Sequence, residues 1–351
     1  MEIIIMAYTR QGGELCVRLK KGLSDRGYPC KGYLFHKYEN GQLERFADAD
    51  ALIGMAFRDG SALVFICAVG IAVRKISGFI RTKATDPPVV VLDDMGKFCI
   101  PLLSGHLGGA NLLAGLCAAV TGGIPVITTA TDIHGKFAVD VFARRNGLYI
   151  TDMNKAKQVS ADLLDGKEIY LYAENACFKD MPSDRSIIVT DDRGRVKDGG
   201  IAISVKACEN GGVLQLIPKQ VTLGIGCRRG TPKEQIAAAV REVLLEHEIA
   251  FACVKQVCSI DLKRNEAGLT AFCDENGLPL RTFSGGELKE ALGSFVHSAF
   301  VEDVTGVDNV CERSAVIGSG GTLFLKKTVR EHVAVAAAIE TAALWFAQTE
   351  T

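Results

Sequence analysis

The sequence lacks the features that mark several large classes of protein. Its 40 basic and 41 acidic residues give a net charge of −1 and are spread along the chain. No basic surface for nucleic acid or for an anionic membrane is therefore expected. No uninterrupted apolar segment is long enough to cross a membrane, and the apolar run at residues 2–7 is too short for a signal peptide. We expect a cytoplasmic protein that acts on a small molecule.

Two common ligand motifs are also missing. The twelve cysteines form no Cys-x-x-Cys pair and are scattered, often within apolar runs, so we expect reduced core thiols and no metal site. No P-loop occurs, and Gly230 follows Gly224-Ile225-Gly226 one residue later than a dinucleotide-binding turn requires. The sequence therefore predicts no resident cofactor. A nucleotide-dependent enzyme that uses the Gly226 loop stays as an alternative, which predicts a thermal shift with NAD or ATP.

Short apolar runs alternate with longer amphipathic ones, which predicts an α/β fold with mostly parallel sheets. A chain of 351 residues is too long for one ordinary core. We divide it into an N-terminal α/β domain (1–137), a smaller middle domain or linker (138–218) and a C-terminal α/β domain (219–351). The predicted strands include 3–7, 62–68, 89–92, 98–103, 124–128, 169–172, 187–190, 221–225, 251–259 and 322–325. The predicted helices are 13–26, 69–79, 110–120, 233–246 and 286–294, whereas 333–339 is ambiguous.

The most informative segment is the turn Ser104-Gly105-His106-Leu107-Gly108-Gly109-Ala110-Asn111, which joins a predicted strand to a predicted helix. Three glycines there let backbone amides approach a ligand, and the amides of a helix start favour negative charge. His106 adds a proton carrier. The alternative is that the glycines only fit a tight turn.

Other candidate residues follow predicted strands, where α/β folds place ligands. Asp132 ends the segment Thr128-Thr129-Ala130-Thr131-Asp132, although an aspartate there also caps turns. Arg228 and Arg229 stand before a predicted helix and suit carboxylates, unless they form a solvated basic turn. We also predict a capping box at Thr231-Pro232-Lys233-Glu234. Further charged candidates are Arg74, Lys83 and Asp86 in the first domain, and Lys263, Glu266 and Glu312 in the last.

Several of these motifs together resemble the CbiG family of cobalamin biosynthesis. They are Ala68-Val69-Gly70-Ile71-Ala72-Val73-Arg74, Lys83-Ala84-Thr85-Asp86-Pro87, the glycine turn with Leu102-Leu103 before it, Thr128 to Asp132, Gly224-Ile225-Gly226-Cys227-Arg228-Arg229-Gly230-Thr231, the Lys263 and Glu266 segment, Thr305-Gly306-Val307 and Cys311-Glu312. The resemblance covers nearly the whole chain in the same order.

The resemblance implies hydrolysis of the ring A δ-lactone of cobalt-precorrin-5A, with loss of a two-carbon unit as acetaldehyde, to give cobalt-precorrin-5B. The cobalt is carried by the substrate. Our hypothesis gives catalytic roles to His106, Asp132 and Glu312. The expected substrate-binding residues are Arg74, Lys83, Asp86, Ser104, Gly105, Gly108, Gly109, Asn111, Thr129, Gly226, Arg228, Lys263 and Glu266. The expected partners are this corrinoid and, transiently, neighbouring pathway enzymes. The alternative is a non-catalytic corrinoid-binding partner of the pathway methyltransferases.

Overall fold

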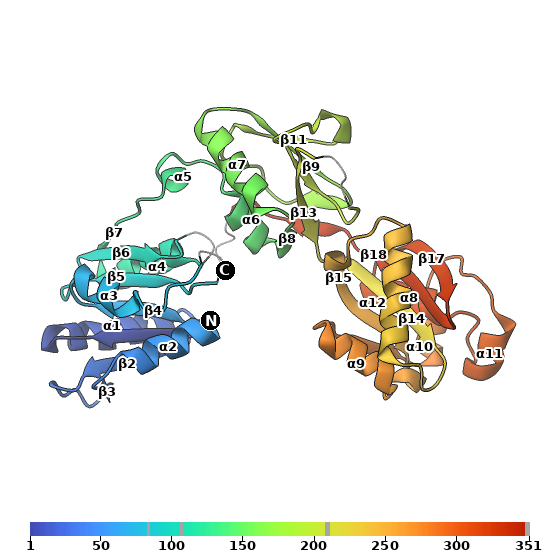
Figure 1. Ribbon diagram of the computed structural model, residues 1–351, viewed down its shortest axis with the longest axis horizontal. Coiled ribbons are helices and arrows are strands. Elements are labelled where there is room, and N and C mark those ends of the chain that lie inside the picture. The colour runs from blue at the N-terminus through green and yellow to red at the C-terminus, as the bar shows by residue number, and fades with distance from the viewer. Residues whose placement is uncertain (83–84, 106–107, 208–210, 348–351) are drawn as a thin grey trace. The chain divides into compact units, whose positions relative to one another are not determined.

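The computed structural model describes residues 1–82, 85–105, 108–207 and 211–347. The chain forms two compact units, residues 1–136 and 137–351 (Figure 1). Each unit is described by itself. Within the described ranges, no helix combines the length and the apolar character needed to cross a membrane.

The described residues of the first unit form a mixed sheet in the strand order β3-β2-β1-β4-β5-β6-β7, in which the β5–β6 pair is antiparallel and the other pairs are parallel. Its elements are β1 (Ile3–Ala7), α1 (Arg10–Ser24), β2 (Cys30–Phe35), β3 (Glu44–Phe46), α2 (Asp50–Asp59), β4 (Ala62–Ile66), α3 (Val69–Ile76), β5 (Val89–Leu92), β6 (Phe98–Leu103), α4 (Ala110–Thr121), β7 (Ile124–Pro125) and α5 (Ala130–Ile133). The predicted α/β class is confirmed.

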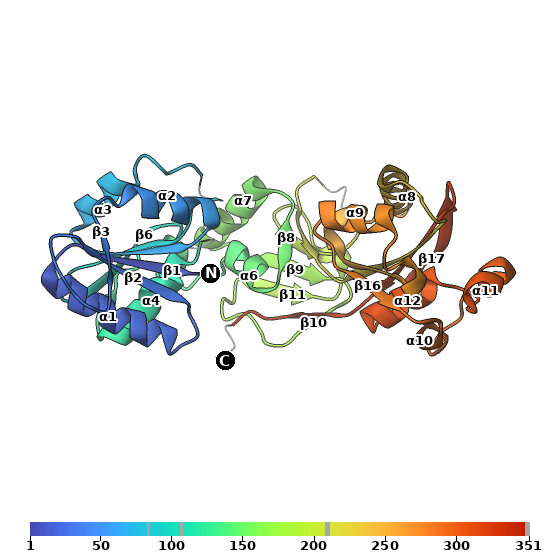
Figure 2. The ribbon, with the colours of Figure 1, turned by 90° about the horizontal axis from the view of Figure 1, so that it is seen from below.

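Helices cover both faces of this sheet because its central strands are apolar on both sides. In β1, Ile3 and Ile5 face the core made with α1 and α4, whereas Ile4 and Met6 face the core made with α2 and α3. Figure 2 shows these two helix pairs on opposite sides of the sheet. Thr9 starts α1, since its hydroxyl accepts the Gly12 N–H at 2.9 Å.

The antiparallel direction of β6 decides where the glycine turn lies. Leu103, the last residue of β6, pairs with Val89, the first residue of β5. The turn therefore lies at the edge where β1, β4 and β5 begin. Helix α3, which follows the end of β4, starts at the opposite edge.

The middle region, whose sequence pattern is loose, forms a sheet in the order β11-β9-β12-β13-β8, with only β8 antiparallel to its neighbour. Its elements are α6 (Val139–Arg145), β8 (Leu148–Ile150), α7 (Met153–Leu164), β9 (Ile169–Ala173), β10 (Ala176–Phe178), β11 (Ile187–Thr190), the 3-10 helix Arg193–Arg195, β12 (Ile201–Ile203) and β13 (Leu214–Pro218). It has its own apolar core, which includes Phe142, Leu163 and Leu171.

The last region has the sheet order β16-β15-β14-β18-β17, with β14, β15 and β16 parallel and the β17–β18 hairpin antiparallel to β14. Its elements are β14 (Val221–Cys227), α8 (Lys233–Glu246), the 3-10 helix Phe251–Cys253, β15 (Val254–Ile260), the 3-10 helix Asp261–Lys263, α9 (Ala267–Glu275), β16 (Leu280–Phe283), α10 (Gly285–Lys289), α11 (Ala299–Thr305), α12 (Cys311–Ser319), β17 (Thr322–Arg330) and β18 (Val333–Ile339).

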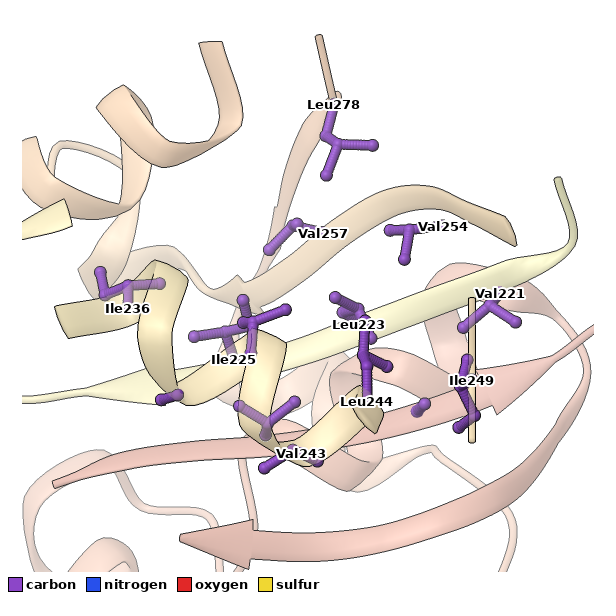
Figure 3. Close-up of a cluster of buried hydrophobic side chains, with 14 of the residues drawn as sticks. Val221, Leu223, Ile225, Ile236, Val243, Leu244, Ile249, Val254, Val257 and Leu278 are labelled. Atoms are coloured by element: carbon purple, nitrogen blue, oxygen red, sulfur yellow. The ribbon is translucent and has the colours of Figure 1, made fainter. Parts of the chain in front are cut away.

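The two faces of strand β14 pack against different helices. Its residues Val221, Leu223 and Ile225 point into the core made with α8 and α9 (Figure 3). The alternate residues face α12, and Gly224 allows the closest approach. A Cβ there would overlap the carbonyl of Cys311 at the start of α12. Gly224 therefore serves helix packing.

Three local predictions need comment. The capping box at Thr231 is wrong: Pro232 is the N-cap of α8 without a side-chain cap, and the Thr231 hydroxyl donates to the Arg228 carbonyl at 2.9 Å. A capping box does occur at Ser284, with Glu287, at the start of α10, which is shorter than the predicted helix 286–294. The ambiguous segment 333–339 is the strand β18, because it pairs along its length with β14.

The C-terminal tail returns to the middle region, although the sequence places it with the last domain. Strand β19 (Ala342–Leu344) pairs with β10 in a two-stranded sheet, and Leu344 is buried in the core of the middle region. The Phe346 ring stacks on Phe178 with centroids 5.3 Å apart. The middle region is therefore built from two separate parts of the chain.

Candidate functional site

The first group of candidate residues lies at the glycine-turn edge of the first unit. Ser104 adopts a positive φ of 56°, and its hydroxyl donates to the Asp86 carbonyl at 2.8 Å. The Asp86 carboxylate is buried and accepts the Arg81 N–H at 3.0 and 3.1 Å. These bonds close the loop before β5 against the end of β6. The carboxylate oxygens of Asp86, which were expected to bind substrate, therefore stabilise the loop that carries Asp86.

The glycines of the turn are needed for close packing. A Cβ on Gly108 would overlap the Ser104 side chain, and a Cβ on Gly105 would lie 2.8 Å from Asn111 Oδ1. Gly109 has a φ of 88°, in the region that favours glycine. The Ala110 N–H donates to Ser104 O, and the Asn111 N–H donates to Gly105 O, both at 3.1 Å. Two amides at the start of α4 are therefore already used within the turn.

Three predicted residues from two segments meet at this edge. The Asn111 side-chain amide donates to Thr129 Oγ1 at 3.0 Å and to Asp132 Oδ2 at 2.6 Å. Asn111 lies in the first turn of α4, whereas Thr129 and Asp132 flank the start of α5. Asp132 is exposed and held by Asn111. This arrangement fixes a solvent-accessible carboxylate beside the glycine turn.

Other predicted residues of the first unit stand apart from this group. His106 and Lys83 lie outside the described residues, so their roles stay predictions. Arg74 lies on α3, which starts at the opposite edge of the sheet, and its guanidinium donates to the Gly70 carbonyl of the same helix at 3.2 Å. Arg81, which the prediction left out, reaches the glycine-turn edge through its backbone.

A second group lies where β14 and β15 end. These strands are parallel neighbours, so the loops after them meet at one edge of the sheet. Arg228 is exposed in the loop after β14, and Lys263 follows β15. Lys263 Nζ pairs with Glu266 Oε2 at 2.8 Å, and Glu266 Oε1 accepts the Gly230 N–H at 2.7 Å. The bond from the Gly230 N–H thus ties the loop that carries Arg228 to Glu266 and Lys263.

Two groups of this second edge, the Glu266 carboxylate and the Cys227 thiol, have shifted pKa values. For Glu266, burial acts to raise the pKa, but the bonds from Lys263 and the Gly230 N–H, with the charges of Lys263 and Arg229, lower it overall. Burial raises the pKa of the neighbouring Cys227 thiol, although Lys263 opposes that shift. At neutral pH this edge therefore holds an ionised carboxylate and a protonated thiol. Gly226 lies beside them with space for a Cβ, whose nearest neighbour would be Ala334 Cβ at 3.7 Å.

Glu312 occupies a different environment from the one expected of a second base. It has no exposed surface, and its carboxylate accepts the N–H groups of Val296 at 2.8 Å and Lys327 at 2.7 Å. The Asn309 side-chain amide donates to it at 2.9 Å. With three donors and full burial, this carboxylate on α12 has a structural role. It connects α12 to the loop of Val296 and to strand β17 through hydrogen bonds. Asn309 was missed by the sequence reasoning, since nothing in its local pattern signals burial.

A metal site needs several ligating side chains close together. Across the described ranges, His, Cys, Asp and Glu side chains nowhere gather in threes close enough to hold a metal ion.

Comparisons with known proteins place this chain in a family. The family models match in three parts: "Cobalamin synthesis G N-terminal" over residues 51–132, "Cobalamin biosynthesis central region" over 137–218 and "Cobalamin synthesis G C-terminus" over 221–338. The chain is 34% identical over 284 residues to the "Cobalt-precorrin-5A hydrolase" of Salmonella typhimurium, covering 79% of this chain and 81% of that protein. The chain belongs to the CbiG family.

Two further relatives show how far the similarity extends. The "Cobalt-precorrin-5A hydrolase" of Priestia megaterium is 29% identical over 357 residues, which cover 95% of this CbiG-family chain and 94% of the relative. "Protein CobE" of a Sinorhizobium species is 27% identical over 121 residues, 34% of this chain and 79% of CobE. In this CbiG-family protein, the glycine turn lies within the matched N-terminal part, and the Arg228–Glu266 edge lies within the matched C-terminal part.

Proposed function

We propose that this CbiG-family protein is a cobalt-precorrin-5A hydrolase of anaerobic cobalamin biosynthesis. It opens the ring A δ-lactone and releases the two-carbon unit as acetaldehyde, leaving cobalt-precorrin-5B. The similarity to the Salmonella hydrolase along most of the chain carries this proposal. The polar group of Asn111, Thr129 and Asp132 beside the glycine turn supports it, because lactone opening needs positioned proton acceptors.

The substrate explains the second edge. A corrinoid precursor is a flat apolar macrocycle that carries many acetate and propionate carboxylates. Arginine binds carboxylates through two parallel hydrogen bonds, and lysine binds them as a point charge. We assign Arg228 and Lys263 to this recognition. Arg74 and Lys83 stay proposals for the same task in the first unit.

The reaction begins with attack of water on the lactone carbonyl. His106 is the proposed general base for this water, and the amides of Gly108 and Gly109 are the proposed donors to the oxyanion. The ester C–O bond breaks to give a carboxylate and an alcohol. Asp132, held by Asn111, then takes the hydroxyl proton while the adjacent C–C bond breaks in a retro-aldol step, with the electron pair passing to the macrocycle. Since Glu312 is buried, the second base is Asp132.

No resident metal or cofactor is needed in this proposal, because the substrate carries the cobalt. The partner is the corrinoid intermediate, with transient contacts to neighbouring pathway enzymes. We place the reaction in the cytoplasm. The cysteine thiols of the described residues are free, and eight of them are buried, which suits a reducing compartment.

The deciding experiment measures acetaldehyde release from anaerobically prepared cobalt-precorrin-5A, coupled to alcohol dehydrogenase. Wild-type protein is compared with His106→Ala, with Asn111→Ala and with Asn265→Ala, an exposed asparagine that serves as control. We expect wild-type and control release. His106→Ala loses turnover by about 10²–10⁴-fold, the usual contribution of a general base. Asn111→Ala lowers kcat with little change in KM, because Asp132 loses the hydrogen bond from Asn111 that orients it.

Each other outcome has a distinct meaning. Release by His106→Ala at the wild-type rate would move the base elsewhere while keeping the enzyme. Corrinoid binding without any acetaldehyde from wild-type protein would replace the hydrolase with a non-catalytic partner of the pathway methyltransferases. A thermal shift with NAD or ATP would favour the nucleotide-dependent alternative.

A further inference from the structure

The edge formed by the ends of β14 and β15 contains a carboxylate whose position conflicts with direct substrate binding. Glu266 stands directly before α9, yet its side chain does not cap that helix. Instead, one oxygen accepts the Gly230 N–H at 2.7 Å and the other accepts Lys263 Nζ at 2.8 Å. Glu266 is 8% exposed. Both oxygens are thus committed to groups on two different loops.

The charge of Glu266 argues further against contact with the substrate. Its pKa is lowered, despite burial, by the bond from Lys263, the Gly230 N–H and the charges of Lys263 and Arg229, so it is ionised at neutral pH. An ionised carboxylate repels the carboxylates that edge a corrinoid. Its favourable partners are the cations around it. Arg228, Arg229, Lys263 and Glu266 together carry a net charge of about +2, so the edge stays attractive to anions.

The backbone of the loop after β14 packs closely against the start of α9. Gly230 has a φ of 77°, and the Thr231 hydroxyl donates back to the Arg228 carbonyl at 2.9 Å. A Cβ on Gly268, in the first turn of α9, would overlap the Thr231 carbonyl. The loop therefore lies directly against α9, and Glu266 is the side chain that joins it to Lys263.

We propose that Glu266 is a positioning residue that joins the loop of Arg228 and Arg229 to Lys263, so that these cations form one preorganised site for substrate carboxylates. This inference rests on the proposed corrinoid substrate. Lysine carries three N–H donors, and one of them points to Glu266, which fixes the direction of the ammonium group. Preorganised cations lose less entropy on binding than flexible ones. Glu266 thus raises affinity without touching the ligand.

The test measures binding of cobyrinic acid, a corrinoid with free carboxylates, and of its fully methylated ester, by absorbance titration at several salt concentrations. The variants are Glu266→Gln, which keeps the shape and removes the charge, and Glu266→Asp, which keeps the charge. Glu275→Gln is the matched control, because Glu275 forms an exposed pair with Lys233 at the other end of α9. Hydrogen exchange of the Gly230 amide reports the loop directly.

We expect Glu266→Gln to weaken binding of the acid about tenfold, the size of one charged hydrogen bond, and to leave the ester unchanged. The Gly230 amide exchanges faster in that variant, Glu266→Asp recovers part of the affinity, and Glu275→Gln behaves as wild type. Wild-type affinity for the acid in Glu266→Gln would overturn the proposal. Equal loss of acid and ester together with a lower Tm would reduce Glu266 to a structural residue.

The outcome is separable from that of the proposed function. If the wild-type protein binds the acid in a Glu266-dependent way but releases no acetaldehyde, the hydrolase proposal fails and the positioning role stands. If acetaldehyde is released and Glu266→Gln leaves KM unchanged, the hydrolase stands and the positioning role fails.

Discussion

Individual carboxylates in this protein have similar chemistry and very different surroundings. Asp132 is exposed and oriented by Asn111, whereas Asp86 is bonded to the backbone of its own loop. Glu266 links two loops, and Glu312 is fully buried with three donors. Burial costs a carboxylate its hydration, and hydrogen bonds must replace that hydration. The partners of each group therefore decide whether its oxygens stay accessible or are used within the fold.

Glu312→Gln tests the role of the buried carboxylate. The amide NH₂ of glutamine would face an N–H donor, so one hydrogen bond is replaced by an unfavourable contact. We expect the free energy of unfolding to fall by about 1–3 kcal/mol, measured by urea denaturation, while the folded variant keeps its turnover. Glu290→Gln, an exposed substitution, is the control. Unchanged stability with lost turnover would restore Glu312 as a catalytic base.

At the scale of helices and strands, the packing of the last region depends on how large and small residues alternate along β14. Large residues of β14 point to α8 and α9, and Gly224 between them faces α12. A second glycine, Gly318 on α12, meets Cys258 of β15, where a Cβ would overlap the sulfur. Helix α12 therefore packs against the sheet at these two glycines without room for a further carbon atom.

Gly224→Ala tests this close approach. The new methyl group would overlap the Cys311 carbonyl, so either α12 or β14 must move. We expect a loss of about 1–3 kcal/mol in the free energy of unfolding, as overpacked cores show. Gly226→Ala, two residues along the same strand, has its nearest contact at 3.7 Å and is the control. Equal Tm values for the two variants would contradict this account of the packing.

Many of these elements are predictable from local pattern. The apolar run at 3–7 and the amphipathic run at 233–246 match β1 and α8, since their periodicity reflects which face is buried. Helix α12 was not predicted, because its buried face consists of small and polar residues such as Ser314. The strand β18 was ambiguous, because an alanine-rich run becomes a strand only when β14 supplies its hydrogen bonds.

For the molecule as a whole, the segment 342–347 completes the middle region of the second unit. The Asp180 carboxylate accepts the N–H groups of Phe346 and Ala347, both at 2.6 Å. Asn146 bonds the backbone of Trp345 with both ends of its side chain, at 2.8 and 3.0 Å. With β19 paired to β10, these bonds make the tail a structural part of the middle region.

Leu344→Ala tests that role. Leu344 is 1% exposed in the middle core, and a buried Leu→Ala change costs about 2–5 kcal/mol. We expect a lower Tm and faster proteolysis within residues 137–218. Ala343→Ser, on the exposed side of the same strand, should unfold like the wild type. If Leu344→Ala unfolded at the wild-type temperature, the tail would be dispensable for the middle region.

The sequence by itself determined the α/β class and the segments that hold the candidate site residues, because periodicity and glycine turns are local properties. It also placed Asn111, Thr129 and Asp132 among the candidates. Only the tertiary structure decided which of them meet. The reversed direction of β6 separates the glycine turn from the start of α3, and parallel pairing places the loops of Arg228 and Lys263 at one edge of the sheet. Burial with three hydrogen-bond donors makes Glu312 a structural residue. Such outcomes depend on strand order and on contacts between distant segments, which no local pattern contains.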